Sequence, residues 1–438
     1  PDPLVPLAMQ SLLRNKVLTI SDLAYLPITF FPSLFKEAYT GRHMEILKLM
    51  VAAWPFPCLP VGSLMKTSDV EALQALLDCI DMLQSQKVRP RRRKLQEVDL
   101  RNVHQDFWDG RIGTLERDCL TETGSEQQVG KSLRSHARRR LLKVVIDLSL
   151  SVHLKEHQRC LLQWAQHRKG SVRLCCLKMN ICLFPVDIIK EVLDIFQPDC
   201  VEELEVSTNQ VLHFLGHFAP CFDRMRNLRK FRLTHIYLTK DKAVHHSAHM
   251  KEKWAVEFLS HFSKLNCLQH LCLDGVNFTC KHMIGMFSGV VFAKSRCTHL
   301  RVLLENVAGT LQTLELVRCS MEDSQLSDIL PALSQCSQLT RANFYDNNFS
   351  TAGLKNLLES MGNLNKLTVE LYPAPLECYD LEGNVLVEKF TQICPELMDI
   401  LIGKRNSKTI IIFATYICLE CCKRCIYDME TQLCSCWQ

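Results

Sequence analysis

The stretch LRKFRLTHI (Leu228–Ile236) decides the fold, because its pattern Leu-x-x-Leu-x-Leu-x-x-(Cys/Val/Ile/Asn) recurs along the chain. Further copies are LQHLCLDGV (Leu268–Val276), LQTLELVRC (Leu311–Cys319) and, more loosely, LTRANFYDN (Leu339–Asn347). Each copy predicts a short strand with inward-facing residues, then a turn and a helical stretch. One unit cannot bury its own apolar face, so the units must stack. The pattern predicts an α/β leucine-rich-repeat solenoid (horseshoe), which is typical of binding proteins.

The repeat has uneven spacing. Its anchors Val201, Leu228, Leu268, Leu311, Leu339 and Leu364 are 27, 40, 43, 28 and 25 residues apart. The shorter separations match a repeat that carries a helix. Residues 239–254 look like a polar insertion, and residues 280–305 fit the repeat poorly, which indicates a degraded or lost unit. Helices are expected at Asp323–Leu333 and Gly353–Met361.

The rest of the chain is expected to flank these repeats. Residues 1–94 predict a helical N-terminal cap, with helices at Ala8–Thr19, Gly41–Ala53 and Ser68–Gln84. Residues 95–108 predict a first strand at Leu95–Leu100, and 109–140 a polar, partly disordered loop. Repeats are expected over 141–400, beginning with helix, strand and helix at Leu141–Trp164, Val172–Cys182 and Pro185–Phe196. Residues 401–438 predict a last strand and a short cysteine-rich tail.

Composition narrows the class of protein. The 438 residues are 47% hydrophobic and 23% charged, as in folded proteins, and the net charge of +5 does not favour direct nucleic-acid binding. No apolar run approaches the ~18 residues of a membrane span, and no signal peptide is recognised. We therefore expect the 23 cysteines to be reduced thiols in the cytoplasm and nucleus, away from any membrane.

Alternation along the strands assigns side chains to an outward, concave face. The residues expected there to bind a protein substrate are Glu203, Glu205, Lys230, Arg232, His270, Asp274, Arg341, Asn343 and Tyr345. A merely solvated polar face is the alternative. No P-loop, Gly-x-Ser-x-Gly, His-Glu-x-x-His or Gly-x-Gly-x-x-Gly motif is found, so the sequence predicts neither an enzyme nor a required cofactor.

Three kinds of short motif suggest partners. Ser11-Leu12-x-x-x-Lys16-x-x-x-Ile20 has the spacing of the helix by which substrate receptors engage an elongin–cullin ligase, with Lys16 where a small residue is usual. Leu-x-x-Leu-Leu occurs at Leu73–Leu77, Leu300–Leu304 and Leu354–Leu358, and it docks into nuclear-receptor grooves or else simply fills a core. Basic runs at 89–94 and 134–140 are nuclear-import signals, nucleic-acid contacts or solvated faces.

The last residues combine two thiol pairs. Cys418-x-x-Cys421 is followed, after twelve residues, by Cys434-x-Cys436. Two such pairs can surround one tetrahedral zinc ion, so the spacing predicts a structural zinc site at these four cysteines. Cys422 and Cys425 are competing ligands, and free or oxidisable thiols are the alternative.

Several segments resemble the PRAME family (preferentially expressed antigen in melanoma). They are Gly41-Arg42-His43, WPFPCLP (54–60), VRPRR (88–92), HQDFW (104–108), Leu174-Cys175-Cys176, LYPAPLE (371–377) and the cysteine tail. The resemblance covers essentially the whole chain.

The resemblance implies a substrate-recognition adaptor of a cullin-2 RING E3 ubiquitin ligase, with the ligase-docking helix at Ser11, Leu12 and Ile20. Implied partners are the elongin–cullin-2 subunits and protein substrates. It also implies transcriptional repression and control of proliferation, differentiation and apoptosis. The alternative is a nuclear corepressor scaffold in retinoic-acid-receptor signalling, which binds nuclear receptors or chromatin factors and acts without ubiquitylation.

Overall fold

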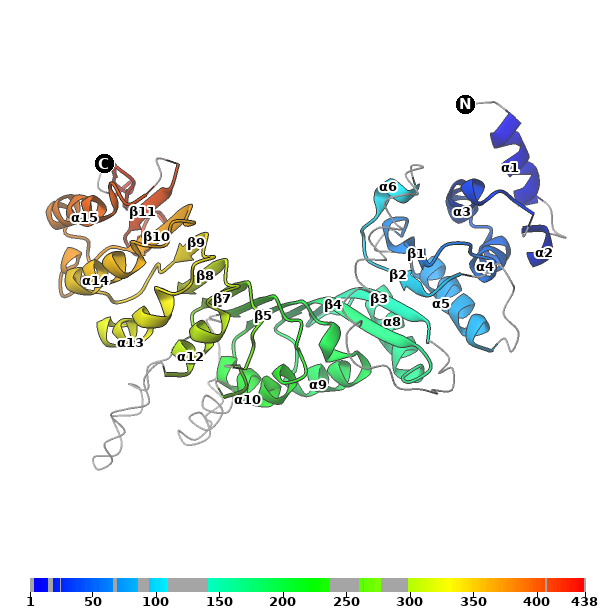
Figure 1. Cartoon of the computed structure of the whole chain (residues 1–438), viewed down its shortest axis with the longest axis horizontal. Coiled ribbons are helices and arrows are strands. Elements are labelled where there is room, and N and C mark those ends of the chain that lie inside the picture. Colours follow the sequence, from blue (N-terminus) through cyan, green and yellow to red (C-terminus); the bar gives the residue numbers. More distant parts are fainter. Residues whose placement is uncertain are drawn as a thin grey trace, which may run out of the picture. The chain divides into compact units, whose positions relative to one another are not determined.

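The computed structural model describes residues 4–14, 19–23, 25–65, 69–85, 94–108, 141–236, 260–262, 264–276, 298–405 and 408–436. It is a mixed α/β structure that divides into two compact units, residues 1–178 with 191–197 and residues 179–190 with 198–438. The chain passes from one unit to the other within β4 (Arg173–Cys182) and α9 (Val186–Ile195). Figure 1 labels the elements.

Unit 1 combines short helices with parallel strands. The helices are α1 (Leu4–Arg14), α2 (Ile20–Leu23), η1 (Ile28–Phe30), α3 (Phe31–Thr40), α4 (Met44–Ala52), η2 (Val61–Ser63), α5 (Val70–Ser85), α6 (Gln105–Trp108) and α8 (Glu156–His167). The strands β1 (Cys58–Leu59), β2 (Glu97–Asp99) and β3 (Lys143–Ser151) pair in parallel in this order. The helices predicted around residues 41–53 and 68–84 and the strand within 95–100 are confirmed.

Aromatic side chains fill the core of unit 1. Trp54 is fully buried and packs edge-on against Phe35 and Phe56, while Phe107 meets Phe56 at 90°. The Trp54 indole donates to the carbonyl of Cys58 at 2.9 Å, so its polar atom is satisfied. The two aromatic segments at 54–60 and 104–108 thus form one cluster, although they lie far apart in sequence.

Two predicted helices of unit 1 were wrong in part. Residues 143–151 form strand β3, and the helix begins only at Glu156. Within β3, residues 144–146 are all buried, and from Ile146 on buried residues alternate with the exposed Asp147 and Ser149, which is the two-residue period of a strand and not a helical stripe. The first helix ends at Arg14, and Thr19 instead caps α2 through bonds with Asp22.

Unit 2 repeats a strand and a helix. Its parallel strands pair in chain order as β5 (Glu203–Thr208), β6 (Lys230–His235), β7 (His270–Asp274), β8 (Thr313–Val317), β9 (Arg341–Asn343), β10 (Val369–Pro373) and β11 (Ile410–Ala414). The helices are η4 (Pro198–Cys200), α10 (Val211–Phe222), α12 (Thr298–Val307), α13 (Asp323–Leu333), α14 (Thr351–Met361), η6 (Leu376–Cys378) and α15 (Val387–Leu401). β12 (Ile426–Tyr427) and β13 (Thr431–Gln432) add an antiparallel end.

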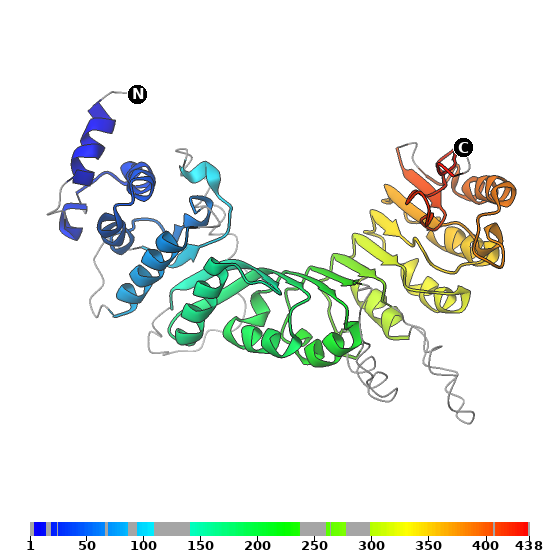
Figure 2. The ribbon, with the colours of Figure 1, turned by 180° about the vertical axis from the view of Figure 1, so that it is seen from behind.

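Helices cover one side of the unit 2 strands, and the other side is open, as both views show (Figures 1 and 2). The predicted alternation is confirmed: Leu204, Phe231, Leu271 and Leu314 align across four strands and are all fully buried. Their neighbours along each strand point to the open side. This is a solenoid-like arrangement of stacked units.

The last position of the sequence pattern ties one repeat to the next. The Asn347 side chain is buried and donates to the carbonyl of Leu316, at the end of the preceding strand, at 2.7 Å. It also accepts the backbone N–H of Met321 at 3.1 Å. Cys319, one repeat earlier, donates its thiol to the carbonyl of Leu273 at 3.4 Å. Small polar or thiol side chains at this position thus satisfy backbone groups in a buried turn.

Several sequence predictions lie outside the described residues. These are the loop at 109–140, the polar insertion at 239–254, both basic runs except Lys94, and residues 280–297 of the poorly fitting segment. The remainder of that segment forms most of α12, which begins at Thr298.

Candidate protein-binding face and cysteine cluster

The open side of the unit 2 strands carries three rows of side chains, set by the strand register. One row is Glu203, Lys230, His270, Thr313 and Arg341; the second is Glu205, Arg232, Cys272, Glu315 and Asn343; the third includes Ser207, Thr234, Asp274 and Val317. We call this surface the strand face. All nine residues predicted for it, Tyr345 included, are half-buried and lie on it or at its edge, whereas Cys272 is buried.

Charges on the strand face pair with one another across strands. Glu315 on β8 accepts from Arg341 on β9 at 2.8 Å and lies 3.4 Å from Arg232 on β6. Lys230 lies 2.5 Å from Glu205 and 3.8 Å from Glu203. Burial alone would raise the pKa of Glu315, but the hydrogen bonds and the two arginine charges hold that pKa below its usual value. The face is therefore a mutually neutralised lattice, not a patch of one charge.

The remaining face residues are also held in place. His270 lies 3.0 Å from the Thr313 hydroxyl, and burial, with the charge of Lys230, lowers the pKa of its imidazole. Asp274 accepts two hydrogen bonds from Arg318, at 2.7 and 2.9 Å. Asn343 accepts the backbone N–H of Tyr345 at 3.0 Å. A partner thus meets side chains that are already ordered.

The tail reaches the edge of this face through a residue that sequence reasoning missed. The Arg424 guanidinium donates to both carboxylate oxygens of Asp346, at 2.5 and 2.6 Å, and to the carbonyl of Thr415 at 2.6 Å. Its central carbon lies 5.2 Å from the centre of the Tyr345 ring. No local sequence signal links Arg424 and Asp346, because they are 78 residues apart.

The predicted ligase-docking residues divide over two helices. Ser11 and Leu12 lie on α1, where Ser11 is exposed and Leu12 is half-buried, while Ile20 begins α2. Thr19 between them is not helical, so the three residues do not share one helix. Lys16 lies outside the described residues.

The Leu-x-x-Leu-Leu leucines are core residues. The three leucines of each copy, at 73–77, 300–304 and 354–358, are between 0% and 6% exposed. A receptor groove would have to draw them out of the fold. Their burial favours the packing interpretation of the motif.

The four cysteines of the predicted zinc site come together. The sulfur atoms of Cys418, Cys421, Cys434 and Cys436 all lie within 4.8 Å of one another. One pair lies in the turn after β11 and the other follows β13, so the β12–β13 hairpin brings them to one place. Cys422 and Cys425 are outside this group; Cys425 is buried and accepts the backbone N–H of Cys434 at 3.3 Å.

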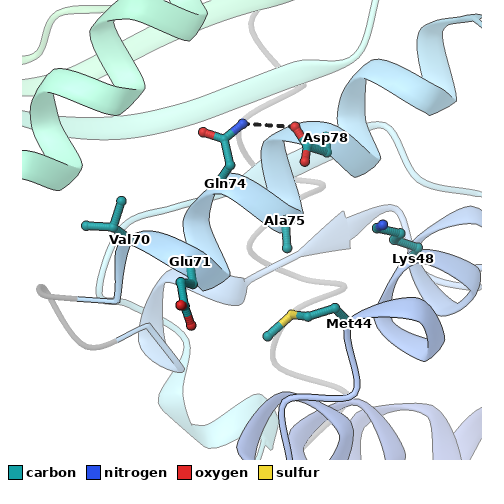
Figure 3. Close-up of a pocket in the computed structure, with 7 residues that line it drawn as sticks. All are labelled: Met44, Lys48, Val70, Glu71, Gln74, Ala75 and Asp78. Carbon is teal, nitrogen blue, oxygen red and sulfur yellow. Dashed lines mark hydrogen bonds between the residues drawn. The ribbon is translucent and has the colours of Figure 1, made fainter.

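A groove in unit 1 lies between α4 and α5 (Figure 3). Met44 and Lys48 line it from α4, and Val70, Glu71, Gln74, Ala75 and Asp78 from α5. It measures about 370 Å³ and is open to solvent, and its residues do not form a nucleophile–base set. Among the described residues, no helix has the length and apolarity to cross a membrane.

The stacked units and the ordered strand face define a solenoid-like repeat protein with an extended open surface. Family models match the PRAME N-terminal domain over residues 1–108 and the PRAME C-terminal domain over residues 142–284 and 279–436. The chain belongs to the PRAME family.

Relatives of known sequence are similar to this chain over almost its full length. The chain is 38% identical to human "PRAME family member 20", with 100% of this chain and 99% of that protein covered. It is 36% identical to mouse "Preferentially expressed antigen in melanoma-like protein 7", at 100% and 99%, and 35% identical to mouse "Oogenesin-3", at 99% and 93%. The two C-terminal matches meet at residues 279–284, inside one of the long gaps between repeat anchors.

Proposed function

We propose that this chain is a substrate-recognition adaptor of a cullin-2 RING E3 ubiquitin ligase. In this role the strand face binds a protein substrate, and Ser11, Leu12 and Ile20 contact elongin–cullin-2 subunits. Other subunits transfer ubiquitin, so the chain is not an enzyme and needs no cofactor for this role. The outcome is transcriptional repression and control of proliferation, differentiation and apoptosis, in the cytoplasm and nucleus.

The observation that carries the binding role is the paired lattice of the strand face. A lattice spread over five parallel strands suits an extended protein segment better than a small molecule, which needs an enclosing pocket. Because Glu315, Arg232 and Arg341 already order one another, binding costs less side-chain entropy than it would on a mobile surface. The ligase role rests in addition on the family resemblance and on the exposed N-terminal helix.

Co-purification tests the ligase role. The full chain, a Leu12→Ser variant and a Leu7→Ser control would be recovered from cells and probed for elongin and cullin-2. Leu7 is an exposed leucine on the same helix, outside the motif. We expect ligase subunits with the wild type and with Leu7→Ser, and a loss of roughly tenfold or more with Leu12→Ser, as for a central contact worth about 1.4 kcal/mol or more.

Two results would overturn the proposal: absence of ligase subunits from the wild type, or equal recovery with Leu12→Ser. The corepressor alternative predicts equal repression of a reporter gene by the wild type and Leu12→Ser. The buried Leu-x-x-Leu-Leu leucines give that alternative no support in the folded chain.

A further inference from the structure

We propose that Cys418, Cys421, Cys434 and Cys436 bind one zinc ion that closes the C-terminal tail and holds Arg424 against the strand face. The four sulfurs lie within 4.8 Å of one another, close enough to share one ion. Cys418 and Cys436 sulfurs are 3.7 Å apart, and Zn–S bonds of about 2.3 Å require S–S edges of about 3.8 Å. The zinc replaces one proton on each thiol, and these protons pass to solvent.

Backbone groups around the cluster already suit thiolates. The N–H of Lys423 bonds to the Cys421 sulfur, and the N–H of Cys436 bonds to the Cys434 sulfur. Donors of this kind orient metal-bound sulfur and stabilise its negative charge.

The tail has almost no apolar core of its own. The β12–β13 hairpin has two residues in each strand, and within residues 416–436 only Cys425 and Cys434 are buried. So small a segment is typical of folds that a metal stabilises. A disulfide between Cys418 and Cys436 is a poorer fit, because bonded sulfurs lie about 2.05 Å apart and these two sulfurs are 3.7 Å apart.

Zinc in this place would also act on the strand face. Arg424 stands between the two ligand pairs in sequence, and its guanidinium bridges to Asp346 and covers Tyr345. Metal loss would free the tail and expose the Tyr345 ring. The zinc site thus decides whether this end of the face is closed by the tail. This step rests on the strand face being a binding surface; the metal site itself does not.

The first test is metal content. Full-length protein without a polyhistidine tag is analysed for zinc and iron as the wild type, as Cys418→Ser/Cys421→Ser, and as the control Cys267→Ser/Cys422→Ser. Both control cysteines are exposed and outside the cluster. We expect one zinc ion per chain in the wild type and the control and a loss of at least about tenfold in the first variant, which keeps only two ligands.

The wild type itself gives a second test that needs no folded variant. After chelator treatment under reducing conditions, cobalt(II) should bind in a 1:1 ratio and give the intense absorption of tetrahedral thiolate–cobalt. Iron in place of zinc, no zinc in the wild type, equal zinc in both double variants, or a disulfide among the four cysteines in freshly purified protein would each overturn the site.

Hydrogen exchange tests the effect on the strand face. Zinc removal should speed exchange in residues 415–436 and around Tyr345 and Asp346, and leave β5–β7 unchanged. Unchanged exchange around Tyr345 with zinc removed would overturn the closing role while the metal site stands.

Discussion

At the scale of single residues, an ion pair occupies the inward row of the strands, which apolar side chains fill in β5–β9. Glu370 is fully buried on the inner side of β10, level with Ala342 and Ile411 of the neighbouring strands. The Arg405 guanidinium donates to its carboxylate at 2.5 Å and to the carbonyls of Met361 and Gly362, at the end of α14, at 2.8 and 3.0 Å. Arg405 therefore joins the helix end to the strand.

Removal of Arg405 alone should be costly. Arg405→Met leaves the Glu370 carboxylate buried without a positive partner, which costs about 3–5 kcal/mol in comparable pairs. The free energy of unfolding from denaturant titration measures this loss. The double variant Glu370→Leu/Arg405→Met should be more stable than Arg405→Met, because no charge then stays buried. A double variant less stable than the single one would contradict this account.

At the scale of elements, a three-membered contact fastens α5 to α8 in unit 1. Asp81 accepts two hydrogen bonds from Arg168, both at 2.7 Å, and one from the Trp164 indole at 3.1 Å. The hydrogen bond from Arg168 is the main cause that lowers the pKa of Asp81 below its ordinary value of 3.8. Hence the ionised form stabilises the helix pair.

The pH dependence of this contact has a definite sign. Because the pKa of Asp81 is lower in the folded chain, its stabilisation is complete above about pH 4 and is lost as pH falls through the lowered pKa. Asp81→Asn should lower the melting temperature at pH 7, by the equivalent of about 1 kcal/mol for this partly exposed pair. The difference from the wild type should shrink below pH 4; a difference that is constant down to pH 3 would count against the mechanism.

At the scale of the whole molecule, the strand face and the helices that cover the other side of unit 2 offer surfaces of different kinds. Arg341 on the strand face is a half-buried cation, and Lys355 on α14 is an exposed one. Arg341 is ordered by Glu315, and so belongs to the lattice that we propose binds substrate.

Substitutions on the two surfaces should therefore differ in effect. Arg341→Ala should cost no more than about 1 kcal/mol of stability. It should nevertheless weaken the ubiquitylation of substrates, defined here as proteins that are ubiquitylated with the wild-type chain but not with Leu12→Ser. Lys355→Ala should leave that set unchanged. Quantitative mass spectrometry of ubiquitin-modified peptides compares the two variants with the wild type. Equal effects of Arg341→Ala and Lys355→Ala would contradict the proposal that the strand face binds the substrate.

Periodicity in the sequence by itself determined which residues of β5–β9 point inward, because the two-residue alternation of a strand and the leucine spacing leave one face to bury. The anchor predicted at Leu364 was wrong: the register pairs Glu370, not Leu367, with Ala342, so this repeat begins at Leu367. Spacing also singled out the four cysteines, since a metal site of this class uses short Cys-x-x-Cys and Cys-x-Cys turns. The strand β3 was missed because a dense apolar run resembles a buried helix until its alternation is weighed.

Only the tertiary structure decided which charges meet. Glu315 pairs with arginines from two other strands, and Arg424 crosses from the tail to Asp346, because strand register and chain folding, not sequence distance, set these contacts. The same holds for the Leu-x-x-Leu-Leu motifs and for the cysteine cluster. The motif leucines are core residues because their helices pack on the strands. The four cysteines lie together because the β12–β13 hairpin brings Cys434 and Cys436 back beside Cys418 and Cys421.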